Sequence, residues 1–264
     1  MQYSGANHCY TLKMDSFLTN SELLAITKVL IGSRAFDKEH LTAIIDKLKS
    51  NTTASDKERL GHFIIKEMMH YTAVGSDCDN VIDNVWKLTE CIENHNDISI
   101  TYNKMSREQV KRRIRPLSIM FSEYYFYLIA YRCDGHDDTP IYFRIDRIVD
   151  IIVHRTQFET GYGKDFDEGL LRRKSQFMWP GPARRIRFEF SGPSVQAILD
   201  RLPTARIISS DGSIYIIEAD VYGDGIMMFL LSQGSWVKVL APESFVVQMR
   251  NEISKMAAYY KEPD

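Results

Sequence analysis

Basic residues are concentrated in one short stretch of the sequence. Residues 104–115 contain six basic side chains and a single acid, Glu108. If this stretch runs on as a β-strand, the alternation of side chains places Lys111, Arg113 and Arg115 on one face. Guanidinium groups bind phosphate oxygens through paired hydrogen bonds. This face is therefore a candidate anion-binding surface.

A tyrosine-rich stretch follows at residues 124–131. As a strand it has an even-numbered face suited to a core and an odd-numbered face with up to three phenols, at Tyr125, Tyr127 and Tyr131. Residues 142–148 add two more guanidinium groups. Arginine beside tyrosine suits single-stranded nucleic acid or nucleotides, because phosphates pair with arginine while bases stack on flat groups. A simpler interpretation stays open, in which the charges only keep an edge strand from pairing with another sheet.

Patterns that would indicate an enzyme are weak. Glu67 and His70 have the spacing of half a carboxylate-bridged di-iron site, but such a site needs a second copy and two more glutamates. The sequence has no Cys-x-x-Cys, no His-Glu-x-x-His and no glycine-rich phosphate loop. Four residues have the types for a serine and histidine pair, without a context that favours one: Ser118, Ser122, His136 and His154. We expect no catalytic residue, no metal and no cofactor.

The composition is that of an ordinary folded protein. Of the 264 residues, 44% are hydrophobic and 26% charged, and a net charge of -2 excludes attraction of the whole molecule to nucleic acid or an anionic membrane. The N-terminus lacks a signal-peptide pattern, and the cysteines are widely separated. No apolar run approaches the roughly 18 residues that span a bilayer. We expect a cytoplasmic protein with no membrane contact.

The periodicity predicts an α+β protein. Helical spacing dominates from about residue 20 to 96, with Asn20-Ser21 and Asp37 as capping residues. From Ile98 the period is two, and four strands are expected, at 98–102, 110–121, 124–131 and 141–152. Short strands without intervening helices favour a strongly bent sheet or small barrel.

The C-terminal part has a different order of elements. Residues 154–182 are rich in glycine and proline, which indicates a connector. From residue 184 the order is strand, helix, strand, strand, helix, strand, as in a ferredoxin-like unit. A long helix then begins at Pro242.

Four blocks carry a family resemblance: Arg115-Pro116-Leu117, Phe126-Tyr127-Leu128, Ala130-Tyr131 and the run from Phe143 to Ile148. In this order and spacing they resemble the WYL domain, with Phe126 in place of its tryptophan. Residues 184–262 are similar to the WCX extension that usually follows, and residues 10–50 resemble the helical connector that usually precedes. The implied layout is a helical linker and dimerisation region (1–96), an Sm-like WYL barrel (97–155), a connector (156–182) and a ferredoxin-like WCX domain (183–264).

The resemblance implies the ligand-sensing module of a bacterial transcriptional regulator. The resemblance implies single-stranded nucleic acids and nucleotides as ligand types. It also implies a homodimer, which is typical of such regulators. Carried over residue by residue, the family's ligand surface comprises Arg115, Tyr127, Arg144, Arg147, Ser118 and Tyr131.

The N-terminus departs from the family pattern. Such regulators usually begin with a winged helix-turn-helix, whereas here the segment from Cys9 to Leu12 already resembles its last strand. We expect this DNA-reading module to be absent, so double-stranded DNA would be bound only through a longer parent protein. The chain is then either the effector half of such a protein or a standalone sensor. A dimerisation scaffold without sensing and a nucleic-acid hydrolase stay open as alternatives.

Overall fold

The computed structural model describes residues 18–50, 52–78, 81–134, 140–158 and 166–260, and the backbone alone for residues 2–4 and 9–11. The chain forms two compact units, residues 1–76 and 77–264. Among the described helices, none combines the length and the apolar character needed to cross a membrane.

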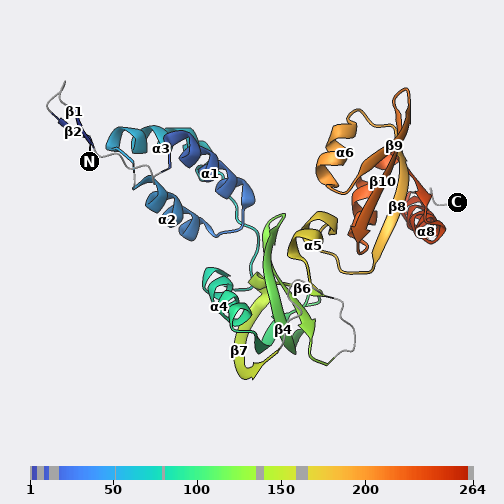
Figure 1. Ribbon diagram of the computed structural model, residues 1–264, viewed down its shortest axis with the longest axis horizontal. Coiled ribbons are helices and arrows are strands. Elements are labelled where there is room, and N and C mark those ends of the chain that lie inside the picture. Colours follow the sequence, from blue (N-terminus) through green and yellow to red (C-terminus); the bar gives the residue numbers. More distant parts are fainter. Residues whose placement is uncertain are drawn as a thin grey trace. The chain divides into compact units, whose positions relative to one another are not determined.

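The first unit is helical (Figure 1). Its elements are the strand pair β1 (Gln2–Ser4) and β2 (Cys9–Thr11), and the helices α1 (Asn20–Ser33), α2 (Lys38–Lys49) and α3 (Ala54–Met69). Ile31, Leu41, Ile45 and Ile64 form its buried core.

Local hydrogen bonds begin the first two helices. Asp37 caps α2 by accepting a hydrogen bond from the backbone of His40, which confirms that prediction. The cap of α1 is Thr19, in a reciprocal pair with Glu22, one residue before the predicted Asn20-Ser21.

The second unit begins with a helix packed on a five-stranded antiparallel sheet. These elements are α4 (Val81–Glu93), β3 (Asn96–Asn103), β4 (Gln109–Ser122), β5 (Tyr125–Arg132), β6 (Ile141–Arg144) and β7 (Ile148–Gln157). The strand order is β6-β5-β4-β3-β7. The expected strand at 141–152 is in fact two strands, because the 3-10 turn η1 (Ile145–Arg147) interrupts it.

Helix α4 belongs with this sheet. Its Leu88 and Cys91 are buried against Ile98, Ile114 and Leu128 on the sheet's inner face. Periodicity alone grouped α4 with the preceding helices, because an apolar stripe does not reveal which surface it covers.

Both faces of β5 are covered, each by a different part of the chain. Leu128 and Ala130 on the even face lie in the core with α4, as predicted. On the odd face Ile129 is also fully buried, in a cluster with Leu171 and Met178. The odd face is therefore not the open surface that the phenols suggested.

The connector supplies this second cover. It contains the helix α5 (Glu168–Lys174), which Asp167 caps. Tyr142 of β6 hydrogen-bonds Ser175, and Ser175 also forms a β-bridge to Tyr222 of the C-terminal sheet. A Cβ on Gly225 would lie 1.9 Å from the carbonyl oxygen of Gln176, so only glycine allows the connector this close approach.

The C-terminal part is a second antiparallel sheet with helices on one face. Its elements are β8 (Ala183–Phe190), α6 (Val195–Arg201), β9 (Arg206–Asp211), β10 (Ile214–Tyr222), α7 (Gly225–Ser232), the 3-10 turn η2 (Gly234–Trp236), β11 (Val237–Ala241) and α8 (Glu243–Ala258). The strand order is β11-β8-β10-β9. Phe188 of β8, Phe229 of α7 and Phe245 of α8 lie in its core.

Candidate nucleic-acid interface

Strand register places four of the predicted ligand residues on one face. Arg115 in β4 lies directly opposite Tyr131 in β5, and Tyr127 in β5 lies directly opposite Arg144 in β6. Residues paired in this way share a face of the sheet, and Tyr127 and Tyr131 are on the same face of β5 because an even number of positions separates them.

The two arginine and tyrosine pairs do not converge on one point. Four residues of extended strand separate Tyr127 from Tyr131, a distance of roughly 13 Å. Arg115 and Arg144 also lie on opposite sides of β5. These guanidinium groups therefore cannot be expected to hold the same phosphate, and a ligand that meets both must be extended.

Arg144 is held inside the protein. Its Nε and Nη2 donate to the two carboxylate oxygens of Asp146 at 3.0 and 2.5 Å, and its guanidinium carbon lies 3.4 Å from the centre of the Tyr125 ring. Burial works to lower the pKa of Arg144, but the hydrogen bonds and charge of Asp146 outweigh it and raise that pKa. Arg144 is thus a positive charge already neutralised by an internal partner.

Two more of the predicted residues are also away from open solvent. The Ser118 residue is only 5% exposed. Arg147 is half-buried in η1 and makes no ion pair within the part of the chain that the structure describes.

The phenols on this face lie beneath the connector. Tyr127 and Tyr131 are half-buried and pack against the cluster that contains Leu171 and Met178. This burial raises the pKa of the Tyr127 phenol, with the Arg144 charge acting in the opposite direction. A ligand reaches these rings fully only if the connector moves.

The accessible cations of this face include Lys111, Arg113 and Arg115, and the side chains of Arg113 and Arg115 are each 48% exposed. Arg113 Nη2 donates to Asp97 Oδ2 and to Thr156 Oγ1, both at 3.0 Å. Arg115 Nε lies 3.6 Å from Asp97 Oδ1, too far for a hydrogen bond. That buried oxygen has no hydrogen-bond partner among the described residues. Arg115 is therefore attracted to Asp97 without being bonded to it.

Sequence reasoning missed Asp97 and Asp146. Asp146 sits two residues after Arg144 in a turn that was expected to be strand. Asp97 adjoins Ile98, whose partner in the sheet is Ile114, and this register brings Asp97 beside Arg115. Strand register would have predicted that Asp97 lies beside Arg115, but the register can be worked out only when the neighbouring strands are known.

The serine and histidine pair is not the one considered from the sequence. His154 Nε2 lies 2.7 Å from the hydroxyl of Ser99, and no hydrogen bond joins its other ring nitrogen to a carboxylate within the described ranges. His136 lies outside those ranges. Elsewhere, Glu67 pairs with Lys28, and the described residues contain no group of three or more His, Cys, Asp or Glu side chains arranged to hold a metal.

Comparison with family models identifies both halves of the second unit. Residues 83–153 match the WYL domain, and residues 182–257 match the WCX domain. The fold and these matches define a WYL-domain protein with a C-terminal WCX extension. The chain belongs to that family, and its two matched segments together make up more than half of its length.

Two solved structures are similar to the chain at low sequence identity. One is proteasome accessory factor B/C (PafBC) of Arthrobacter aurescens, at 17% identity and a TM-score of 0.38, covering 93% of this chain and 36% of that one. The other is described as a CRISPR Cas-related protein, at 17% identity and a TM-score of 0.44, covering 94% of this chain and 75% of that one. The chain thus spans about a third of the PafBC chain. A search of curated proteins gave no match.

Proposed function

We propose that the chain is the ligand-sensing module of a WYL-family transcriptional regulator and binds a single-stranded nucleic acid or nucleotide through Arg113, Arg115 and Tyr131. The observation that carries the proposal is the state of Arg115. Its side chain is half-exposed, lies opposite a tyrosine and has no hydrogen bond to its nearest carboxylate. A guanidinium in this state can turn to an external phosphate without first breaking an internal hydrogen bond.

The proposal differs from the family-based expectation in its residues. Arg113 is added, and Arg144 becomes a structural residue because Asp146 and Tyr125 already hold it. Tyr127 and Ser118 contribute, and the Tyr131 ring becomes fully accessible, only if the connector moves away. Ligand binding near Tyr131 would then disturb the cluster around Leu171 and Met178. The link from Tyr142 through Ser175 to Tyr222 offers a route to the WCX domain.

For the fold itself we propose an Sm-like WYL domain and a ferredoxin-like WCX domain. The support is topological. A helix followed by strands in the order β6-β5-β4-β3-β7 fits a small, strongly bent sheet, and the strand and helix sequence of residues 183–241 is that of a ferredoxin-like unit.

Fluorescence anisotropy with a labelled single-stranded oligonucleotide of about 15 nucleotides tests the binding proposal. Arg115→Gln removes a charge without removing a hydrogen bond to Asp97, so we expect a folded variant with at least a tenfold weaker affinity. Arg155→Gln is the matched control. Within the described part of the chain, Arg155 is exposed and forms no hydrogen bond or ion pair with Asp97 or Arg113. Equal affinities for wild type, Arg115→Gln and Arg155→Gln would overturn the proposal.

A dimerisation scaffold is the second candidate. An apolar groove of about 430 Å³ lies beside α8, lined in part by Leu230, Val239, Met249, Ile253 and Met256. If this groove holds a second copy of the chain, sedimentation should give a dimer that Ile253→Glu converts to a monomer. In the scaffold case the oligonucleotide should not bind at all.

A further inference from the structure

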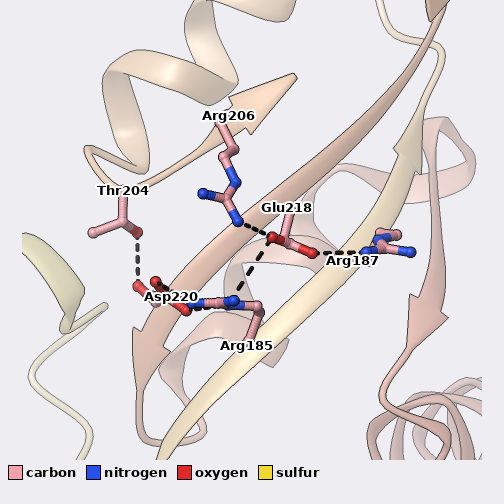
Figure 2. A network of polar contacts seen from close by, with 6 residues as sticks. All are labelled: Arg185, Arg187, Thr204, Arg206, Glu218 and Asp220. Carbon is pink, nitrogen blue, oxygen red and sulfur yellow. Dashed lines mark hydrogen bonds and ion pairs between the residues drawn. The ribbon is translucent and has the colours of Figure 1, made fainter. Parts of the chain in front are cut away.

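The open face of the C-terminal sheet carries a row of charged residues outside the WYL domain (Figure 2). Glu218 in β10 lies directly opposite Arg187 in β8 on one side and Arg206 in β9 on the other. Arg187 Nη2 donates to Glu218 Oε2 at 2.8 Å, and Arg206 Nη2 donates to Glu218 Oε1. Arg185 Nε approaches the same Oε1 at 4.0 Å. Three guanidinium groups therefore surround one carboxylate.

The acidic side chains of this row are less exposed to solvent than the basic ones. The Glu218 side chain is only 9% exposed, whereas Arg187 and Arg206 are 48% and 61% exposed. A guanidinium has five N–H donors. Arg187 and Arg206 each give one of them to Glu218, and Arg185 gives two to Asp220, at 2.8 and 3.3 Å. Most donors of the three arginines are thus not used in these bonds, and all three side chains are about half-exposed.

This arrangement has more positive charge than a cross-strand brace requires. One arginine satisfies one carboxylate, and further guanidinium groups brought within a few ångströms repel one another. Asp220 offsets only one of them. Elsewhere on the face, Lys238 lies opposite Glu189, and Asp211 lies at the end of β9 opposite Ile214, four positions along β10 from Glu218, so the excess of positive charge is confined to the three arginines. An external anion would relieve this repulsion.

A hollow continues the basic surface at one end of the row. It has a volume of about 320 Å³ and is lined by Lys174, Ala183, Arg184, Arg185, Asp220 and Val221. Lys174 comes from the connector helix α5, and its ammonium lies 5.2 Å from the centre of the Tyr222 ring. The hollow thus adds a further cation next to Arg185.

The spacing of the arginines indicates how many anions they meet. Arg185 and Arg187 are two residues apart on one strand, about 7 Å, and Arg206 lies two strands away from Arg187, about 10 Å. These are separations along the backbone, and the Arg187 and Arg206 side chains converge on Glu218, so the row can follow neighbouring phosphates of a flexible strand.

We propose that Arg185, Arg187 and Arg206, held in place by Glu218 and Asp220, form a second binding surface for the phosphate backbone of single-stranded nucleic acid. The contacts are to phosphate, so binding is independent of base sequence and falls steeply with salt. This surface is separate from Arg113 and Arg115, and it does not depend on ligand binding by the WYL domain.

Anisotropy titrations of the whole chain with the same single-stranded oligonucleotide, repeated at several salt concentrations, test this surface. Arg187→Gln/Arg206→Gln should weaken binding about tenfold or more and reduce the slope of log K against log salt by roughly 1.4, the value for two phosphate contacts. The control is Arg250→Gln/Lys255→Gln, which removes two charges from exposed positions on α8 and should leave both quantities unchanged. Arg187→Lys/Arg206→Lys should recover part of the affinity, because the charges return without the guanidinium geometry.

Three outcomes would overturn the proposal: wild type that binds no oligonucleotide, Arg187→Gln/Arg206→Gln that binds as the control does, and an unchanged salt slope. A duplex of the same sequence bound equally well would overturn the assignment to single strands. Arg115→Gln separates the two surfaces. If that variant binds as wild type while Arg187→Gln/Arg206→Gln does not, the WYL proposal fails and this one holds. If Arg187→Gln/Arg206→Gln does not fold, the affinity and the salt slope of Arg187→Lys/Arg206→Lys still test the proposal.

Discussion

Arg144 lies with its guanidinium carbon 3.4 Å from the centre of the Tyr125 ring, stacked on a tyrosine of the same sheet face. Arg144 also forms a bidentate pair of hydrogen bonds with Asp146, a residue that is only 6% exposed. A residue that looks like a ligand contact in the sequence is therefore already occupied within the protein.

Replacing Arg144 should reduce the stability of the fold more than it reduces oligonucleotide binding. In Arg144→Ala the nearly buried Asp146 loses its guanidinium partner, and we expect a loss of roughly 3 kcal/mol in the free energy of unfolding. Urea denaturation followed by circular dichroism measures it, with Arg155→Ala as a surface control expected within about 0.5 kcal/mol of wild type. A variant as stable as wild type but deficient in oligonucleotide binding would return Arg144 to the ligand surface.

Removing the internal carboxylate should strengthen ligand binding. Asp97 attracts both Arg113 and Arg115, so Asp97→Asn frees two cations for an external phosphate while keeping the shape of the side chain. We expect the oligonucleotide affinity to rise about threefold to tenfold, which corresponds to roughly 1 kcal/mol. Anisotropy measures the change, and the increase should disappear in Asp97→Asn/Arg115→Gln. Weaker binding by Asp97→Asn would mean that Asp97 positions the arginines and does not compete for them.

The connector should control access to the phenols. Leu171 is 6% exposed and packs in the cluster that covers Ile129. If the connector stays in place, Leu171→Ala should lower the free energy of unfolding by about 2–4 kcal/mol. If the connector does not stay in place, the substitution should release it locally from the sheet. Hydrogen exchange distinguishes these cases, since release speeds exchange in residues 168–174 and 125–132 alone. Leu240→Ala on the C-terminal sheet, where the side chain is partly exposed, should leave these segments unchanged.

The charged row on the C-terminal sheet should make stability depend on pH. Hydrogen bonds from Arg187 and Arg206 lower the pKa of Glu218, against a smaller opposing effect of burial. A carboxyl with a lowered folded-state pKa contributes stability above its unfolded pKa, and this contribution is lost as the pH falls through the folded value. The difference in melting temperature between wild type and Glu218→Gln should be constant above about pH 5.5 and should shrink below about pH 4. A difference that grows on acidification would contradict the arrangement.

The sequence by itself determined the local features of this protein. Alternation along 125–132 separated Leu128 and Ala130 from the tyrosines, and capping by Asp37 marked the start of α2. The ordered blocks from Arg115 to Ile148 and the elements after residue 183 were enough to indicate WYL and WCX domains, which the family models confirm. Such signals are readable because the period of an element and its cap depend only on residues a few positions apart.

Tertiary structure alone decided which predicted residues are available to a ligand. Asp146 holds Arg144, Asp97 lies beside Arg113 and Arg115, and the connector covers Tyr127. Likewise, the convergence of Arg187 and Arg206 on Glu218 depends on strands 12 to 31 residues apart in sequence. Strand register and the packing of one segment over another bring together groups that are distant along the chain. Whether a charge is free or neutralised follows from those neighbours and not from its own position in the sequence.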